Sequence, residues 1–227
     1  MKKSFLALIS ALMFVAPASA RFENNPIIFP EEYYTNHSMG CLMLGDCRDE
    51  VVEIHSRQDV YDYFGDGYQL PQEFDEILST LKKINVKVFI ASTEYFPVGH
   101  RGVYHTVENN FFLNSFHVKR PHTMMSVMRH EGWHAAQDCM AGGIENNYIG
   151  VIFTEDKIPQ FWKDIAKDTY PQSALPWEQE ATWAGRTEKM TLEALNACAA
   201  GNMWENPDFP PTPLTRQFLI DQGFIKN

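Results

Sequence analysis

The sequence predicts an α+β protein in which a small sheet with its helices comes first and a mainly helical part follows. Two observations lead to this prediction. Between residues 51 and 116, short stretches in which apolar and polar residues alternate, typical of strands, are interleaved with helical patterns. From Thr123 onward, apolar residues recur at helical spacing and the alternation stops. Strands and helices segregated along a chain in this way are typical of the α+β class.

The N-terminal part contains several short elements. Alternating apolar residues predict strands at 51–55 and 85–92, and one or two more within 102–116. Helices are expected at 57–64 and 71–83. The apolar side of the second helix consists of residues three or four apart, namely Phe74, Ile77, Leu78 and Leu81.

The C-terminal part is expected to contain four helices, at 123–141, 159–169, 176–199 and 213–222. Thr123 offers a hydroxyl that can cap the start of the first helix, and Gly142-Gly143 supplies its stop. A proline-rich connector at 206–213 separates the last two helices.

The first 20 residues have the parts of a secretory signal peptide. Lys2 and Lys3 form a basic start, residues 5–15 an apolar core, and Ala18-Ser19-Ala20 a cleavage pattern of small residues. The apolar core is too short to span a membrane. We therefore expect a mature chain that begins at Arg21 and is periplasmic or secreted, with an uncleaved anchor as the alternative.

The length of residues 21–227 suits a single domain with a real core. The formal net charge is −10, and loss of Lys2 and Lys3 with the leader would bring it to −12. This acidity argues against nucleic acid or an anionic membrane as a partner. No later stretch is long and apolar enough to predict a membrane span, and the sequence leaves the oligomeric state open.

Four cysteines follow the predicted cleavage site, and they allow three pairings. Cys41 and Cys47 enclose a short loop with a turn signal, so a local disulfide is natural. This leaves Cys139 and Cys198, near the ends of two predicted helices, for a second bridge. A cysteine zinc site is the alternative, although the spacings do not resemble those of a zinc finger.

The central motif is His130-Glu131-Gly132-Trp133-His134, which reads H-E-x-x-H within a predicted helix. Residues four apart on a helix lie about 40° apart around the axis and about 6 Å apart along it, so two imidazoles can grip one metal ion. Glu131 is turned about 100° away and can reach a water bound to that ion. This pattern is typical of zinc-activated hydrolases. A solvated helix with two surface histidines is the alternative.

A third ligand is expected from the helix that follows Pro176. Glu178 and Glu180 are two residues apart, so only one of them can face the metal. We favour Glu178, because the small side chains that share its face allow close packing, and they are Ala181, Thr182 and Gly185. Thr182 offers a hydroxyl to support a ligand. Glu180 shares its face with Trp177 and Trp183, and it remains the alternative, as a ligand or as a support for the site.

The H-E-x-x-H motif with a later glutamate resembles the gluzincin class of zinc metallopeptidases. The stretch 178–182 is similar to the E-x-E-A-[ND] element of small members, with Thr182 in place of Asn or Asp. The stretch 110–114 resembles the edge strand that lies beside bound peptide in this class. The resemblance implies a small zincin-like domain in which His130, His134 and Glu178 hold Zn²⁺.

These observations together predict an exported zinc metallopeptidase that acts on a protein or peptide substrate. Glu131 would be the general base for a metal-activated water. Tyr148 and Tyr170 are both candidates for a donor to the oxyanion, and the sequence does not choose between them. The alternatives are a non-catalytic binding protein with a zincin fold and a structural domain in which the motif is fortuitous.

Overall fold

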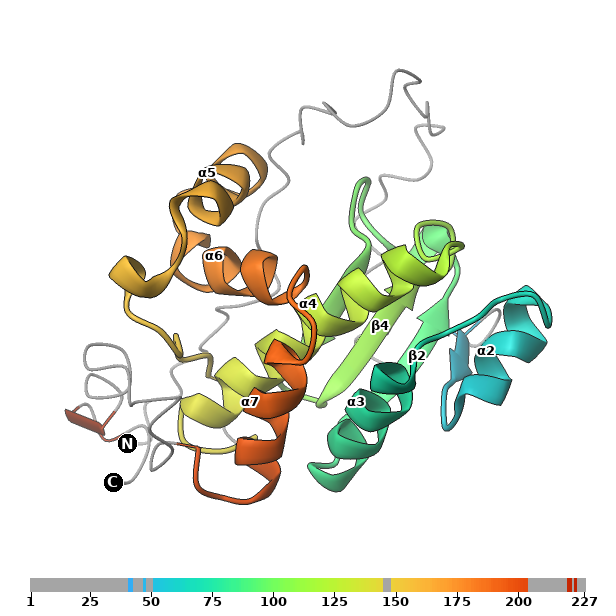
Figure 1. The fold of residues 1–227 in the computed structure, drawn as a ribbon, viewed down its shortest axis with the longest axis horizontal. Coiled ribbons are helices and arrows are strands. Elements are labelled where there is room, and N and C mark those ends of the chain that lie inside the picture. Colours follow the sequence, from blue (N-terminus) through green and yellow to red (C-terminus); the bar gives the residue numbers. More distant parts are fainter. Residues whose placement is uncertain are drawn as a thin grey trace, which may run out of the picture.

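A computed structural model of the chain describes residues 41–42, 47, 51–144, 148–203, 220–221 and 223. The predicted signal peptide, the proline-rich connector and most of the predicted helix at 213–222 lie outside these residues. The described part combines a small mixed sheet with helices, most of them in its C-terminal half, which confirms the α+β prediction (Figure 1).

The elements follow the predicted order closely. The strands are β1 (Val51–Glu53), β2 (Lys87–Ala91), β3 (Gly102–His105) and β4 (Asn110–Asn114). The helices are α2 (Arg57–Phe64), α3 (Gln72–Lys83), α4 (Pro121–Met140), α5 (Gln160–Thr169), α6 (Leu175–Ala184) and α7 (Met190–Ala199). Two short 3₁₀ turns are η2 (Thr93–Tyr95) and η3 (Glu155–Lys157). None of the helices found within the described ranges is long and apolar enough to cross a membrane.

The sheet has the order β1-β2-β4-β3. β2 and β4 run parallel, and the two outer strands are antiparallel to their neighbours. β4 therefore pairs on both sides, and the prediction that residues 110–114 form an edge strand is wrong. β3 forms this edge of the described sheet. The chain runs through β3 first and then turns, through Asn109 at φ 52°, into β4, which lies between β3 and β2. The sequence pattern alone does not reveal which strand of such a hairpin joins β2.

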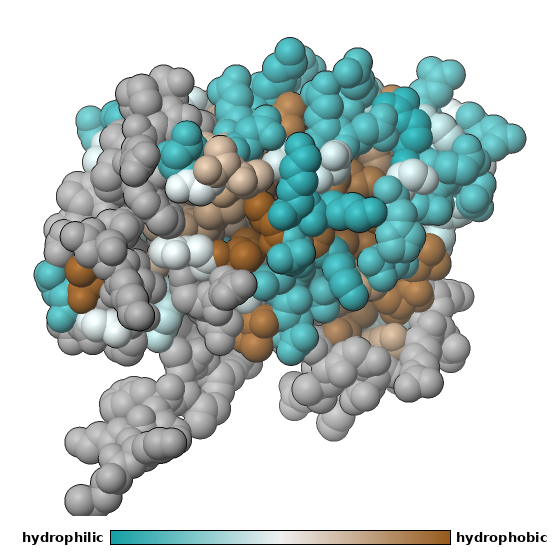
Figure 2. Space-filling model, turned by 90° about the horizontal axis from the view of Figure 1, so that it is seen from below, coloured by the Kyte–Doolittle hydropathy of each residue, from teal (hydrophilic) through white to brown (hydrophobic). Residues whose placement is uncertain are grey.

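Helices α3 and α4 pack against one face of the sheet, and α7 packs against both of these helices (Figure 1). Side chains of alternate strand residues point into this main core, among them Val88, Ile90, Phe111 and Leu113. The opposite face carries a smaller cluster in which Phe112 and Ala91 pack with Phe96 and Leu42. The face of the molecule in Figure 2 is mostly hydrophilic, with hydrophobic residues visible between the polar ones.

The central helix α4 begins two residues earlier than predicted. Pro121 occupies its first turn, where a missing N–H costs nothing, and Thr123 does not cap it. The Arg120 carbonyl instead accepts the first helical hydrogen bonds. The predicted stop is confirmed, because Gly142 and Gly143 have φ of 129° and 130°, which favour glycine.

The predicted helix at 176–199 is two helices, because the chain turns between Gly185 and Lys189. Lys189 has a left-handed φ of 64°, and its backbone N–H donates to Glu73 Oε1 at 2.7 Å. The same buried carboxylate accepts two hydrogen bonds from Arg129 on α4. This long-range capture of the backbone turns the chain so that α7 packs along α4.

Gly132 lies where α7 crosses α4, which explains a residue that is otherwise unfavourable inside a helix. A Cβ atom at this position would lie 2.9 Å from Thr191 Cγ2. The close approach lets the Thr191 hydroxyl donate to the Arg129 carbonyl at 2.8 Å. Trp133, the next residue of the motif, is fully buried in the core.

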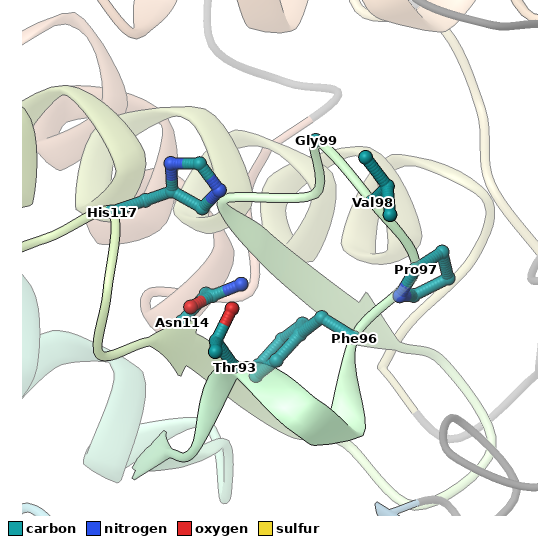
Figure 3. Close-up of a pocket in the computed structure, with 7 residues that line it drawn as sticks. All are labelled: Thr93, Phe96, Pro97, Val98, Gly99, Asn114 and His117. Atoms are coloured by element: carbon teal, nitrogen blue, oxygen red, sulfur yellow. The ribbon is translucent and has the colours of Figure 1, made fainter. Parts of the chain in front are cut away.

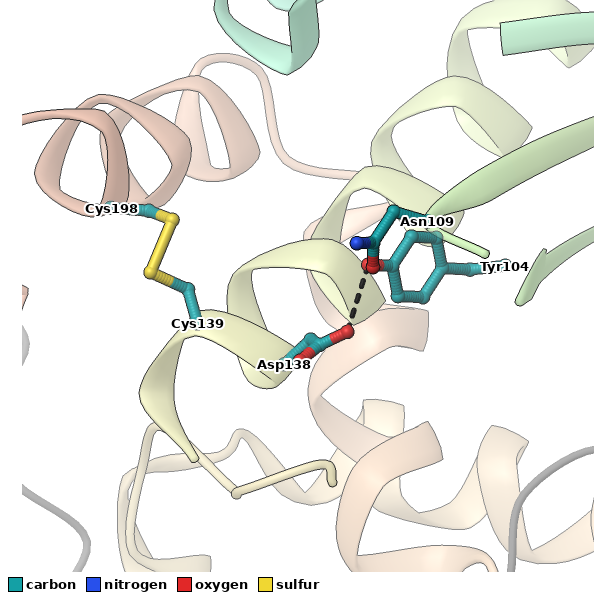
Figure 4. Close-up of a disulfide and its surroundings, with 5 residues drawn as sticks. All are labelled: Tyr104, Asn109, Asp138, Cys139 and Cys198. Carbon is teal, nitrogen blue, oxygen red and sulfur yellow. Dashed lines mark hydrogen bonds between the residues drawn. A yellow bond between two sulfur atoms is a disulfide. The ribbon is translucent and has the colours of Figure 1, made fainter. Parts of the chain in front are cut away.

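Both predicted disulfides are present. Cys41 joins Cys47, and Cys139 joins Cys198 (Figure 4). The second bridge fastens the C-terminal end of α4 to that of α7. Beside it, Asp138 is fully buried and accepts a hydrogen bond from the Tyr104 hydroxyl at 2.9 Å. The two features tie α4 both to α7 and to the edge strand β3.

We expect loss of the Cys139–Cys198 bridge to destabilise the fold more than loss of Cys41–Cys47. The bridged residues are 59 apart in the first case and 6 in the second. The chain-entropy model gives losses of about 4 and about 2 kcal/mol, respectively. Denaturant unfolding of the two double Cys→Ser variants measures both. Equal losses, or a larger loss at Cys41–Cys47, would contradict the inference that the Cys139–Cys198 bridge holds α4 and α7 together.

Asp138 makes stability depend on pH. Burial raises its pKa to about 8, against the opposing effect of the Tyr104 hydrogen bond. The unfolded chain ionises this carboxyl near pH 4, so the free energy of unfolding should fall as pH rises from about 4 to about 8. Asp138→Asn should stabilise the protein at pH 8, by on the order of a few kcal/mol, and change little at pH 4.

Urea unfolding at several pH values tests this, with Asp168→Asn at an exposed position of α5 as the control for loss of one charge. A destabilisation by Asp138→Asn that is the same at all pH values would show that the buried carboxyl is ionised in the native state.

Candidate metal centre

Helices α4 and α6 bring His130, His134 and Glu178 together. One ligand atom from each of the three side chains lies within 4.8 Å of the others. His130 Nε2 is 3.2 Å from Glu178 Oε2, and His134 Nε2 is 3.6 Å from Glu178 Oε1. The three residues that the sequence singled out as ligands therefore meet in space, and this group could bind a metal ion.

The spacing fits ligands around an ion better than a direct ion pair. Hydrogen-bonded pairs between charged groups are usually about 2.7–2.9 Å apart. Two ligands held about 2.1 Å from a tetrahedral ion lie roughly 3.4 Å from each other. The observed 3.2 and 3.6 Å agree with the second arrangement. Glu178 Oε2 is also buried, with no hydrogen-bond partner of good geometry among the described residues.

The electrostatics of the three groups are coupled. Burial alone would raise the pKa of Glu178, but the neighbouring His134 and His130 together lower it. Burial alone would lower the pKa of His130, but the neighbouring Glu178 carboxylate raises it. Glu178 is therefore ionised at neutral pH and available as an anionic ligand.

The small face of α6 allows this approach. Ala181 is fully buried, and a Cβ atom at Gly185 would lie 3.0 Å from the Ser126 carbonyl oxygen and 3.2 Å from His130 Cβ. The prediction that small residues beside Glu178 let α6 pack closely on α4 agrees with these distances. A larger residue at 185 would push Glu178 away from the histidines.

Glu180 points the other way, as expected for a residue about 200° around the helix. It is fully buried and accepts hydrogen bonds from Trp133 Nε1 at 3.1 Å and from the backbone N–H of Ile152 at 2.9 Å. Burial raises its pKa to about 7, against the opposing effect of these donors and Gln137. Of the two glutamates, Glu178 lies at the histidine pair.

The histidines are supported by groups that the sequence reasoning missed. Gln137 Oε1 lies 2.8 Å from His134 Nδ1, and the backbone of Ala181 hydrogen-bonds to His130. Within the described part of the chain, no hydrogen bond joins Thr182 to a ligand, so Gln137 fills the role expected of Thr182. The sequence signal for this contact is that Gln137 lies three residues after His134 on the same predicted helix.

Glu131 lies beside the ligands without joining them. It is 7% exposed, and burial raises its pKa, while the two histidines act in the opposite direction. The backbone N–H of Tyr104 hydrogen-bonds to this carboxyl. A Cβ atom at Gly102 would lie 2.9 Å from Glu131 Oε1, so the edge strand β3 runs directly against it.

Of the two tyrosines considered, Tyr170 lies at the site. Its hydroxyl oxygen is 3.5 Å from His130 Nε2, and its ring stacks on that imidazole with centroids 6.2 Å apart. Burial, followed by the charge of Glu178, raises its pKa well above the usual value, so the phenol keeps its proton. His100, in the loop before β3, is also near enough for the Glu178 charge to act on it. No local sequence pattern marks His100.

A small pocket lies between the loop after η2 and the end of β4 (Figure 3). The lining residues are Thr93, Phe96, Pro97, Val98, Gly99, Asn114 and His117. Asn114 Nδ2 donates to the His100 carbonyl at 2.8 Å, which fastens this loop. None of the three ligands lines the pocket. His117 lies at this pocket and not at the ligands.

Comparisons of the chain with models of known protein families, with curated proteins and with solved structures found no match. What the site does is therefore inferred from its own chemistry.

We expect Gly185→Val to weaken metal binding by at least about tenfold, because the branched side chain separates α6 from α4. Titration with Zn²⁺ against a chromogenic chelator measures this. Gly67→Val is the matched control, since a Cβ atom at Gly67 meets nothing within 4 Å. Unchanged affinity in Gly185→Val would show that close helix packing does not set the position of Glu178.

Proposed function

We propose that this protein is an exported zinc metallopeptidase with a zincin-like fold of the gluzincin type. The observation that carries the proposal is a buried glutamate, Glu131, beside a group of two imidazoles and one carboxylate with the spacing of metal ligands. Two disulfides suit an oxidising compartment, which supports export.

The ligand set favours zinc. Two imidazole nitrogens and one carboxylate oxygen are the protein ligands of one common class of catalytic zinc site. Structural zinc sites usually have four protein ligands, often cysteines, but both pairs of described cysteines form disulfides. Three protein ligands leave a position for water, which a hydrolase needs.

Each remaining side chain has a chemical role in this proposal. His130, His134 and Glu178 would hold a zinc ion, which would supply Lewis acidity and lower the pKa of a bound water toward about 7. Glu131 accepts the proton of the attacking water and passes it to the leaving amine. The neutral Tyr170 hydroxyl donates a hydrogen bond to the oxyanion that develops on the scissile carbonyl.

The substrate would bind along β3. Among the described strands β3 pairs with β4 alone, and it passes Glu131 at Gly102, where a side chain has no room. An extended peptide that hydrogen-bonds to the strand edge would place a backbone carbonyl beside the ligands. A protein or peptide substrate fits this geometry.

The competing proposal is a non-catalytic binding protein that keeps the fold and the metal. A purely structural or binding site has no use for a buried carboxylate beside the metal ligands, and burying one costs stability. Glu131 therefore favours catalysis. A fortuitous motif is disfavoured because Glu178, 44 positions after His134 by the printed numbering, lies at the histidine pair.

We expect the mature protein to bind about one zinc ion per chain, since three ligands converge at one point. His134→Ala and Glu178→Ala should each weaken binding by orders of magnitude. Metal analysis of purified protein and competition with a chelator test this. Stoichiometric zinc in a His130→Ala/His134→Ala variant would place the metal elsewhere.

We expect Glu131→Gln to retain zinc but lose at least about a hundredfold in the rate of peptide hydrolysis, because an amide does not accept the proton. The measurement is cleavage of a fluorogenic peptide library and of unfolded casein, with and without a chelator. A zinc-loaded wild-type protein that cleaves none of these would favour the binding-protein alternative. An active Glu131→Gln variant would exclude Glu131 as the base.

A further inference from the structure

Gln137 links the buried Glu180 to the ligand His134. Gln137 Nε2 donates to Glu180 Oε2 at 2.7 Å and to the Trp177 carbonyl at 3.1 Å. Its other end, Oε1, lies 2.8 Å from His134 Nδ1. All of these atoms are in the packed interface of α4 and α6, on the side of the histidine away from Glu178.

Because the Glu180 carboxylate and the Trp177 carbonyl both accept hydrogen bonds, the Gln137 amide has only one possible orientation. An NH₂ group must face the Glu180 carboxylate and the Trp177 carbonyl, so the amide oxygen faces His134. An amide oxygen only accepts, so His134 must carry its proton on Nδ1. This leaves the lone pair on Nε2, the nitrogen that faces Glu178 across 3.6 Å.

Glu180 itself is held by donors only. Trp133 Nε1, the Ile152 N–H and the Phe153 N–H point at its two oxygens, at 3.1, 2.9 and 2.5 Å. An ionised carboxylate can accept all of these hydrogen bonds together with the one from Gln137. Because it carries no proton, it cannot present a donor to Gln137.

We propose that Glu180 is a positioning residue, which fixes the proton and the ring orientation of His134 through Gln137 and so strengthens metal binding. The inference rests on the proposed function only in taking His134 as a ligand. Outer partners of metal-bound histidines usually contribute about 10–100-fold in affinity.

Glu180→Gln tests the inference because it replaces an acceptor by a group with an NH₂ end. The backbone N–H groups of Ile152 and Phe153 keep the new amide oxygen at their end, so the NH₂ end faces Gln137. The Gln137 amide then turns over and presents a donor to His134, and the proton moves to the metal-facing Nε2. We expect zinc affinity to fall about 10–100-fold. Two-dimensional ¹H–¹⁵N spectra of the metal-free protein at pH 8.5 should show the His134 proton on Nδ1 in wild type and a changed tautomer population in Glu180→Gln.

The exchanged double variant, Gln137→Glu with Glu180→Gln, provides a rescue. The new carboxylate at 137 accepts from His134 Nδ1, and the new amide at 180 donates to it while its oxygen accepts from Ile152 and Phe153. The Trp133 N–H and the Trp177 carbonyl lose their partners in this variant, so we expect a return of the Nδ1 proton and a zinc affinity clearly above that of Glu180→Gln alone. A role of Glu180 in packing alone would give no such recovery.

Glu73→Gln is the matched control. Glu73 is also a buried carboxylate with several donors, from Arg129 Nε at 3.0 Å and the Lys189 N–H at 2.7 Å, but neither leads to His134. Glu73→Gln should lower the free energy of unfolding and leave the zinc affinity within about threefold of the wild-type value. If Glu180→Gln does not fold, Gln137→Met removes the link, and it should weaken zinc binding about as much.

Three results would overturn the inference: wild-type affinity in Glu180→Gln or in Gln137→Met, no recovery in the double variant, or a His134 proton on Nε2 in the metal-free wild type. These outcomes are separate from failure of the proposed function. A wild-type protein that binds zinc without cleaving peptides contradicts that proposal and leaves the positioning role intact.

Discussion

The site depends on one packing contact, the close approach of α6 to α4 at Gly185 and Ala181. Because no side chain at 185 separates the helices, the Glu178 carboxylate reaches both imidazoles, at 3.2 and 3.6 Å. The same contact brings Glu180 to the opposite side of the interface, where it meets Gln137 at 2.7 Å. A single helix–helix interface therefore positions one candidate metal ligand and the support for another.

This arrangement requires charged groups in an interface that is largely buried, which costs stability unless each group is paired. The fold offsets the cost around α4, the helix that all these contacts share. Glu73 and Arg129 hold the turn before α7, and the Cys139–Cys198 bridge fastens α7 to the end of α4. Gly132 lets α7 pack against the opposite side of the motif helix. The two histidines thus lie on a helix that is fastened at its middle and at its C-terminal end.

The features that the sequence predicts well are those that depend on local periodicity. The spacing of His130 and His134 places both on one helical face, and the small residues beside Glu178 favour it over Glu180. The pairing of Cys139 with Cys198 follows once Cys41 and Cys47 are joined by their short loop. The features that it misses depend on long-range contacts. The break after Gly185 requires Glu73 from a distant helix, and the edge position of β3 depends on strand order. The choice of Tyr170 over Tyr148 and the position of His100 depend on loops that meet only in the folded chain.

The most direct test of the account is X-ray absorption at the zinc edge on the metal-loaded mature protein, because it reports the ligands themselves. The geometry predicts two imidazole nitrogens and one carboxylate oxygen at about 2.0–2.2 Å, with a further light atom from water. Glu178→Ala should remove the carboxylate contribution and leave both imidazoles. A wild-type spectrum with sulfur ligands, or one without two imidazoles, would contradict the metal centre on which the proposed function rests.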